Sequence, residues 1–212
     1  MTGDKKTRTR AVVRKLKRRY PEAKCSLTYR NPLQLLVATI LSAQCTDTRV
    51  NIVTKTLFKE YKTAQDYADA DPDVLSEQIR STGFFRNKTK SILGMARAVA
   101  NDHGGKVPNT MKELVALTGV GRKTANVVLG NAFGIDEGVV VDTHVTRITN
   151  RLKLTKHKDA VKIEKDLMEL VPKKDWTIFP HLMIWHGREI CQARTPKCEA
   201  CPIQTLCPSS TV

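Results

Sequence analysis

The chain has 212 residues, of which 41% are hydrophobic and 27% charged, as in an ordinary globular protein. Its formal net charge is +15 at pH 7, from 36 Lys and Arg against 21 Asp and Glu. This surplus favours a polyanionic partner, nucleic acid first and an anionic membrane second, over a protein that is merely basic for solubility. Aromatic residues make up only 5%, which favours contacts to duplex phosphates over a long stacking platform for single strands.

The sequence contains no stretch that approaches the ~18 apolar residues needed to span a membrane. Residues 1–19 are strongly basic but lack the apolar run of a secretory signal. We therefore expect a cytoplasmic, nucleoid-associated protein with no membrane partner. Six cysteines in such a compartment indicate metal binding and not disulfides.

Helical patterns follow one another along the chain, and turn residues separate them. Two helices open with a capping residue and then proline, at Asn31-Pro32 and Asp71-Pro72. Residues 139–141 look strand-like, but three residues do not make a sheet. We therefore predict an all-α fold of about ten helices. The helices are expected over residues 7–20, 33–43, 72–83, 92–104, 111–117, 124–134, 143–152 and 163–171.

The segment 117–125 places two glycines, Gly119 and Gly121, at the junction of two helical patterns. We expect both to adopt backbone angles closed to other residues, so that the turn is tight and its amides point outward. Free amides at a helix start, with Arg122 and Lys123 beside them, form a site suited to one DNA phosphate. The pattern predicts a helix-hairpin-helix DNA-binding element. It leaves open whether Lys123 is a phosphate contact or a nucleophile.

Four cysteines near the carboxy end have the spacing C-x6-C-x2-C-x5-C. Only the central pair has the C-x2-C form of a zinc knuckle, and several short, unequal gaps are more typical of a cubane iron–sulfur cluster. We therefore favour a cluster over zinc, with unligated core cysteines as the remaining alternative. A metal that fixes this loop would be structural and would place Arg194 and Lys197 as DNA-backbone contacts. The four expected ligands are Cys191, Cys198, Cys201 and Cys207.

Together, the hairpin L-x-G-V-G-R-K-T-A, the run V-D-T-H at 141–144 and the cysteine spacing resemble the endonuclease III family. Members of this family are bifunctional DNA glycosylases and abasic-site lyases of base excision repair. The likeness covers the chain from about Asn31 to Cys207, with the motifs in the family's order. The resemblance implies two helical domains with a DNA-binding cleft between them. One is a six-helix barrel over 25–134 that includes the hairpin, and the other combines 1–24 with 135–212 and carries a [4Fe-4S] cluster.

The resemblance also implies the reaction. Members remove oxidised pyrimidines from damaged double-stranded DNA and then cleave the strand by β-elimination through a lysine Schiff base. The family's nucleophilic lysine falls on Lys123 and its essential aspartate on Asp142. A carboxylate stabilises the positive sugar that forms as the base leaves, and an imine at C1′ makes the C2′ proton acidic enough to eliminate the 3′ phosphate. A phosphate contact for Lys123 and a helix cap for Asp142 remain the simpler alternatives.

Reaching a base inside a duplex requires its extrusion and the filling of the space it leaves. In the family a glutamine and an apolar residue on a second loop fill this space, and these positions fall on Gln44 and Phe84. Leucine is usual at the second position, but phenylalanine can also wedge between bases. A polar helix end for Gln44 and a core aromatic for Phe84 are the alternatives. His144 and Asp47 are further pocket candidates, each with an ordinary structural alternative.

Two other functions remain open. A mismatch adenine glycosylase needs the aspartate but not Lys123, and that family carries a further carboxy-terminal domain, whereas this sequence ends five residues after Cys207. A non-enzymatic helix-hairpin-helix protein with a zinc site explains the charge, the hairpin and the cysteines, but gives Asp142 and Gln44 no role. We therefore favour the bifunctional enzyme, acting as a monomer because each site takes one lesion.

Overall fold

The structure, a computed structural model, describes residues 4–212. The chain divides into two compact units. Unit 2 is Cys25–Ile135, and unit 1 combines the described residues up to Lys24 with Asp136–Val212. The boundary therefore lies one residue beyond the expected domain end at 134. Each unit has a separate apolar core of buried side chains.

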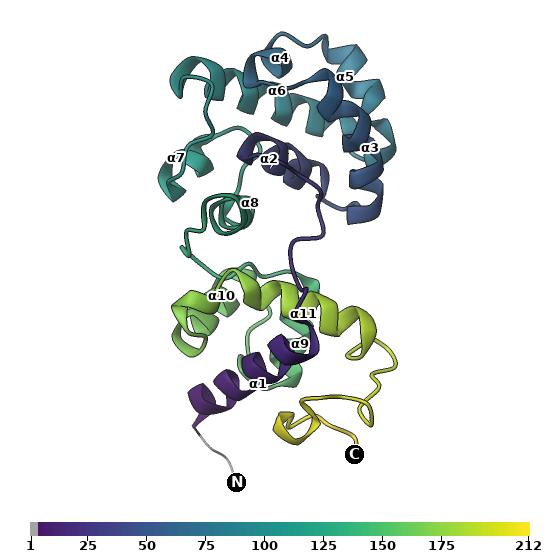
Figure 1. Cartoon of the computed structure of the whole chain (residues 1–212), viewed down its shortest axis with the longest axis vertical. Helices are drawn as coiled ribbons and strands as arrows, with labels where there is room; N and C mark the ends of the chain where they lie inside the picture. The colour runs from purple at the N-terminus through teal and green to yellow at the C-terminus, as the bar shows by residue number, and fades with distance from the viewer. Residues whose placement is uncertain (1–3) are drawn as a thin grey trace. The chain divides into compact units, whose positions relative to one another are not determined.

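All regular structure within residues 4–212 is helical, as the sequence predicts (Figure 1). The stretch 139–141 is an extended connection and forms no strand. The described part of the chain contains eleven α-helices and four short 3-10 or π segments: η1 (Arg80–Thr82), η2 (Leu129–Phe133), η3 (Lys173–Asp175) and η4 (Gln204–Leu206).

Unit 2 is built around α2 (Pro32–Leu41), which is apolar almost all round and is almost entirely buried. Its neighbours pack against it from several sides, and α6, α8 and η2 are among them. A helix buried in this way contributes to the core along its whole circumference, not along one stripe. The other helices of unit 2 are α3 (Asp47–Glu60), α4 (Ala64–Ala68), α5 (Pro72–Gln78), α6 (Phe85–Asp102), α7 (Met111–Ala116) and α8 (Arg122–Val128).

Unit 1 is discontinuous in sequence, and its amino-terminal helix packs against the carboxy-terminal half. The helix α1 contacts α10, α11 and η4, and α9 contacts α11. The helices are α1 (Lys5–Arg19), α9 (Thr143–Arg151), α10 (Ala160–Leu170) and α11 (Ile178–Glu189). The core of this unit is formed by buried side chains on these helices, such as Leu16, Ile148, Leu167 and Phe179.

Several helix starts follow directly from side-chain caps. The Asn31 side chain accepts from the Gln34 amide before α2, and Asp71 accepts from two amides at the start of α5. Thr63 and Asp66 form a complete capping box at α4. Such caps pair amides that a helix leaves free at its first turn.

Three helices lie outside the predicted set: α3, α4 and α11. In α3 the buried positions are Val50, Thr54 and Leu57, so a polar residue interrupts the apolar stripe. In α11 a proline at position 180 obscures the pattern, although proline is tolerated in the first turn of a helix. The weak patterns explain why sequence reasoning missed these helices.

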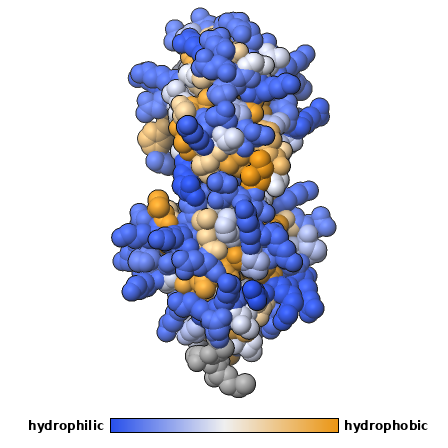
Figure 2. Space-filling model, turned by 90° about the vertical axis from the view of Figure 1, so that its left-hand side faces the viewer, coloured by the Kyte–Doolittle hydropathy of each residue, from blue (hydrophilic) through white to orange (hydrophobic). Residues whose placement is uncertain are grey.

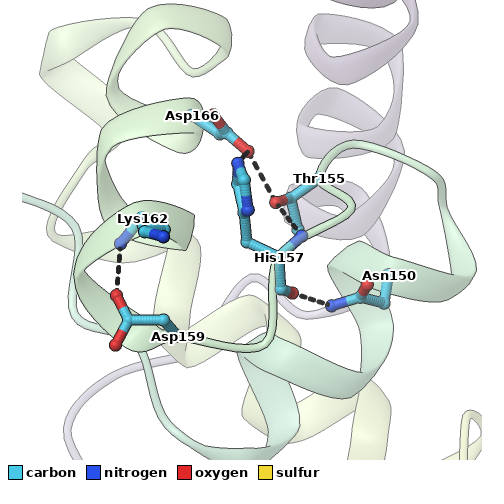
Figure 3. Close-up of polar contacts among 6 residues, drawn as sticks. All are labelled: Asn150, Thr155, His157, Asp159, Lys162 and Asp166. Carbon is cyan, nitrogen blue, oxygen red and sulfur yellow. Dashed lines mark hydrogen bonds and ion pairs between the residues drawn. The ribbon is translucent and has the colours of Figure 1, made fainter.

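The connection between α9 and α10 is held by a polar network (Figure 3). The Thr155 hydroxyl donates to Asp166 at 2.6 Å, and the His157 amide donates to the Thr155 hydroxyl at 3.1 Å. The Asn150 side chain donates to the His157 carbonyl at 3.0 Å. Hydrogen bonds among these four residues therefore hold the segment after α9 against α10.

The surface in the view of Figure 2 is mostly hydrophilic, and hydrophobic side chains gather there only in small patches. Within residues 4–212 no helix is both long and apolar enough to span a lipid bilayer.

Candidate active site and metal centre

The hairpin of segment 117–125 joins α7 to α8 in unit 2. Leu117 and Val120 are buried at 4% and 5% exposure, so the turn is anchored to the core from both ends. Gly119 has φ +77°, and a Cβ there would lie 2.4 Å from the Cβ of Ser91. Only glycine combines this backbone angle with so close an approach to α6. The expected backbone conformation of Gly119 is therefore confirmed, and its contact to DNA stays a prediction.

The prediction for Gly121 is wrong in one respect, because its φ is −90° and other residues can adopt that angle. Gly121 is the N-cap of α8 and is extended, with no side-chain cap and nothing within 4 Å of a Cβ built there. The missing side chain therefore leaves the first-turn amides of α8 open. Arg122 and Lys123 are the first two residues of this helix, and both are exposed.

Asp142 begins α9 in unit 1, as predicted. Its Oδ1 accepts a hydrogen bond from the Val145 amide at 2.8 Å. This bond holds the carboxylate at the positive end of the helix, where a negative charge is stabilised. The side chain is half-buried, so it remains within reach of a bound molecule.

His144 is the second residue of the same helix and packs over Gly187 of α11. Its Nδ1 is 3.1 Å from Arg147 Nη2, and a Cβ on Gly187 would lie 2.6 Å from that Nδ1. Arg147 also donates to the carbonyls of Gly187 and Cys191. The contacts of His144 therefore support its structural alternative, and a role in a pocket stays a prediction.

Gln44 and Phe84 share an unusual backbone conformation in unit 2. Their φ angles are +52° and +48°, and Lys153 is the one other non-glycine residue with positive φ in the described part of the chain. A side chain in this region is strained by about 1–3 kcal/mol, and such strain tends to occur at functional sites. Phe84 is 61% exposed, which excludes the core-aromatic alternative.

Lys88, which the sequence analysis did not select, connects the two loops that carry Gln44 and Phe84. Its Nζ donates to the Leu41 carbonyl at 2.7 Å and to the Thr82 carbonyl at 2.8 Å. Leu41 ends α2, three residues before Gln44, and Thr82 lies two residues before Phe84.

Lys88 is only 4% exposed, and burial lowers the pKa of its ammonium. No sequence signal could have found it, because most lysines in a polar helix segment are solvated. Asp47, the remaining pocket candidate of unit 2, is the first residue of α3 and is half-buried.

The four cysteines of the carboxy-terminal segment line one pocket in unit 1, together with Arg151 and His186. Within residues 4–212 no three His, Cys, Asp or Glu side chains meet closely enough to hold one metal ion, so the thiols surround a volume and not a point. A cubane with four irons takes one thiolate at each iron, so ligands placed around a common volume fit such a group.

The surroundings of this pocket fix the cysteine loop from one side. Arg151 donates to Cys191 Sγ at 3.2 Å and to the carbonyls of Gln192 and Ala193 at 2.7 Å each. His186 is 1% exposed, and its Nε2 lies 3.7 Å from Cys201 Sγ. Burial lowers the pKa of His186 to about 4, so its ring is neutral at pH 7.

The thiols differ in their surroundings. Burial raises the pKa of Cys201 and of Cys207, whereas hydrogen bonds from Thr211 lower the pKa of Cys198. Metal binding must therefore displace protons from these two half-buried thiols. Arg194 and Lys197 are both exposed on the loop between the first two cysteines, where a phosphate can reach them.

Comparison with known proteins agrees with this site. Residues 37–173 match the model of the HhH-GPD superfamily of base excision DNA repair proteins. Residues 191–207 match the iron–sulfur binding domain of endonuclease III, and this span begins at Cys191 and ends at Cys207. The match supports a [4Fe-4S] cluster over zinc, and the four cysteines are consistent with its ligands.

Curated relatives named endonuclease III are similar to the chain over most of their length. The chain is 54% identical over 208 residues to endonuclease III of Synechocystis, covering 98% of this chain and 95% of that protein. It is 48% identical over 189 residues to endonuclease III of Bacillus subtilis, covering 89% and 86%.

Solved structures are similar over the same length. A non-covalent endonuclease III–DNA complex has a TM-score of 0.91 at 42% identity, covering 99% of this chain and 97% of that one. A trapped endonuclease III–DNA covalent intermediate matches with the same TM-score and identity, covering 99% and 98%. The chain belongs to the endonuclease III family of base excision DNA repair enzymes.

Proposed function

We propose that this protein removes oxidised pyrimidines from duplex DNA and then cleaves the strand at the abasic site by β-elimination. The observation that carries the proposal is the exposed amine of Lys123 in the first turn of α8, directly after the glycine hairpin. A relative has been trapped as a covalent intermediate with DNA, which is the species that an attacking lysine would form.

The reaction follows from two side chains. Lys123 Nζ, as a free amine, forms a bond to C1′ of the damaged nucleotide, and the base leaves with the electrons of the N-glycosidic bond. Asp142 supplies the negative charge that stabilises the positive sugar in this step. Loss of the amine proton and opening of the sugar ring give an imine. Removal of a C2′ proton then expels the 3′ phosphate, and water releases Lys123.

Gln44 and Phe84 fill the space that the extruded base leaves in the stack. Phe84 supplies an exposed flat ring that can insert between bases, and Gln44 supplies an amide that can pair with the orphaned partner base. Lys88 acts as a positioning residue, because its ammonium binds the Leu41 carbonyl just before the loop of Gln44 and the Thr82 carbonyl just before Phe84. Asp47 and His144 are further candidates for contacts to the extruded base.

The DNA backbone is bound by two groups of residues. Gly119, Gly121 and Arg122 offer open amides and a cation to one phosphate. Arg194 and Lys197 offer two cations on the cysteine loop. Cys191, Cys198, Cys201 and Cys207 would hold the [4Fe-4S] cluster, which would cross-link a segment with little core of its own in a structural role.

The partner is damaged double-stranded DNA, bound one lesion at a time by a monomer at the nucleoid in the cytoplasm. Solved complexes of relatives contain DNA, which supports the coarser part of this statement. The molecular mass measured by sedimentation, with and without a single-lesion duplex, tests whether the protein acts as a monomer.

The decisive experiment is borohydride trapping on a duplex that carries one abasic site. Borohydride reduces the imine to a stable amine, so an active lysine becomes permanently joined to DNA. We expect a covalent adduct with the wild type and with Lys112→Ala, an exposed lysine of α7, and none with Lys123→Ala. Lys123→Ala protein that still formed the adduct would overturn the assignment. Base removal without any adduct in the wild type would favour a monofunctional mismatch glycosylase.

A further inference from the structure

The amino-terminal helix carries a concentration of charge that the reaction does not use. In α1, nine of the fifteen residues are Lys or Arg and none is acidic. Its apolar side chains Val12, Val13 and Leu16 face the core at 3% exposure or less. The cations therefore occupy the outer face of a helix whose inner face is fully packed.

Part of this outer face forms one wall of an open groove of about 390 Å³. The opposite wall is the turn after α10, with Pro172, Lys174 and Asp175. The groove is lined by five cations and one carboxylate, namely Arg10, Arg14, Lys17, Arg18, Lys174 and Asp175. Asp175 is already paired with Lys17 at 2.5 Å.

Three arginines form a regular row along this groove. Arg10, Arg14 and Arg18 are spaced four residues apart, so they lie on one face of the helix. All three are exposed, and none has an ion-pair partner within the described residues 4–212. Like charges at this spacing destabilise an isolated helix, so the row is unfavourable unless an anion covers it.

The stretch 152–171, which covers the connection from α9 to α10 and α10 itself, is different, because its five lysines are balanced by four acids. Figure 3 shows two of these acids, Asp159 just before α10 and Asp166 within it, and the ring of His157 lies 3.9 Å from Asp166. The excess of positive charge in unit 1 is thus concentrated on α1, part of which lines the groove, and is not spread evenly.

The geometry matches a nucleic-acid backbone. At 1.5 Å rise per residue, the row from Arg10 to Arg18 spans about 12 Å, which is three to four base steps at about 3.4 Å per step along one strand. Guanidinium groups suit phosphate because they can donate two parallel hydrogen bonds. A lipid surface fits poorly, because an interfacial helix needs an exposed apolar face and that of α1 is buried.

We propose that the α1 groove is a second binding surface for the phosphate backbone of duplex DNA. It binds without regard to sequence or damage and retains the enzyme on DNA between lesions. Neither Asp142 nor any residue of the cysteine loop lines the groove, so it is separate from the lesion-binding residues of unit 1.

The test measures the salt dependence of binding to long undamaged duplex DNA. The variant is Arg10→Gln/Arg14→Gln/Arg18→Gln, which removes the row without placing any apolar group on the surface. Each lost phosphate contact lowers the slope of log affinity against log salt by about 0.9, so three lost contacts lower it by about 2.7. Single-turnover base removal from a short lesion duplex, at saturating protein, is measured alongside.

The matched control is Lys158→Gln/Lys162→Gln/Lys165→Gln, which removes three exposed charges from the same unit outside the groove. We expect the control to retain the wild-type slope, and the groove variant to retain base removal from the short duplex.

Three results would overturn the proposal. They are an unchanged slope in the groove variant, an equal fall in the control, and loss of base removal in the groove variant under saturating conditions. A groove variant that lost binding to phosphatidylserine vesicles but kept its DNA slope would assign the groove to membranes and also overturn the proposal.

Discussion

The two units place their functional residues by different physical means. In unit 2 the hairpin and the loops of Gln44 and Phe84 rest on a large apolar core around α2. In unit 1 the segment after α11 has no α-helix, and only two of its side chains, Ile190 and Ile203, are buried. That segment is held by the cysteines, by Arg151 and by Arg8, whose guanidinium donates to the carbonyls of Leu152 and Leu206.

The difference shows what a short loop needs in order to be rigid. A loop beside a core can be fixed by buried side chains, as Leu117 and Val120 fix the hairpin. A loop without one has too little apolar area to offset the entropy of ordering it, so covalent cross-links to an inorganic group replace packing. Removal of a cross-link and removal of a core side chain should therefore have different consequences in the two units.

The largest effect is expected from Cys201→Ser, which removes one cluster ligand. Iron content should fall to near zero, and residues 191–212 should become sensitive to protease while unit 2 remains protected. Cys45→Ser, in unit 2, is the matched control and should retain its iron. Measured iron per chain and a protease digestion time course test both. Equal iron loss in the two variants would contradict the ligand assignment.

A core deletion should act on unit 2 instead. Leu36 lies in α2 and is fully buried. Leu36→Ala should lower the free energy of unfolding by about 2–5 kcal/mol, because it removes apolar contacts and leaves a cavity. Urea titration measures the loss, and iron content should be unchanged until unit 2 unfolds. Val74→Ala is the control because Val74 is 50% exposed, and it should cost far less.

Lys88→Met tests whether one buried ammonium positions two loops. The change leaves the carbonyls of Leu41 and Thr82 without this donor, at a cost of about 1–3 kcal/mol in the free energy of unfolding. We expect kcat for base removal to fall while KM for lesion DNA changes little, because DNA still binds but the loops no longer hold their productive conformation.

Lys90→Met, on an exposed position of the same helix, is the control for both measurements. If Lys88→Met instead increased KM and left kcat unchanged, Lys88 would not position the loops.

The smallest effect is the pH dependence of the α4 cap. Hydrogen bonds from the amides of Lys62 and Thr63 lower the pKa of Asp66 below its ordinary value. Its stabilisation is therefore present above the unfolded pKa and is lost as pH falls through the folded one. Asp66→Asn should reduce stability by less than about 1 kcal/mol at neutral pH, and the difference from wild type should begin to shrink below about pH 4 and vanish once the pH is below the folded pKa. Unfolding curves at several pH values measure it, and a difference that persisted in acid would contradict the ionic origin.

The sequence by itself determined the helical class, several helix ends and the chemistry-bearing residues. Caps at Asn31, Asp71 and Asp142 act through amides within three residues, so local sequence contains the whole interaction. The cysteine spacing and the hairpin glycines are equally local. The prediction for Gly121 failed because a cap position and a left-handed turn both select glycine, and only the backbone angle separates them.

Tertiary structure decided the features that join distant segments. Lys88 binds a carbonyl 47 residues away in the chain, and Arg151 binds carbonyls more than 40 residues away. The groove beside α1 exists because the amino-terminal helix packs against the turn after α10. Pattern along the chain contains no information on such pairs, since either partner alone resembles an ordinary solvated cation. The strain at Gln44 and Phe84 is likewise a property of the folded loops, which hold these residues at angles that the free chain would avoid.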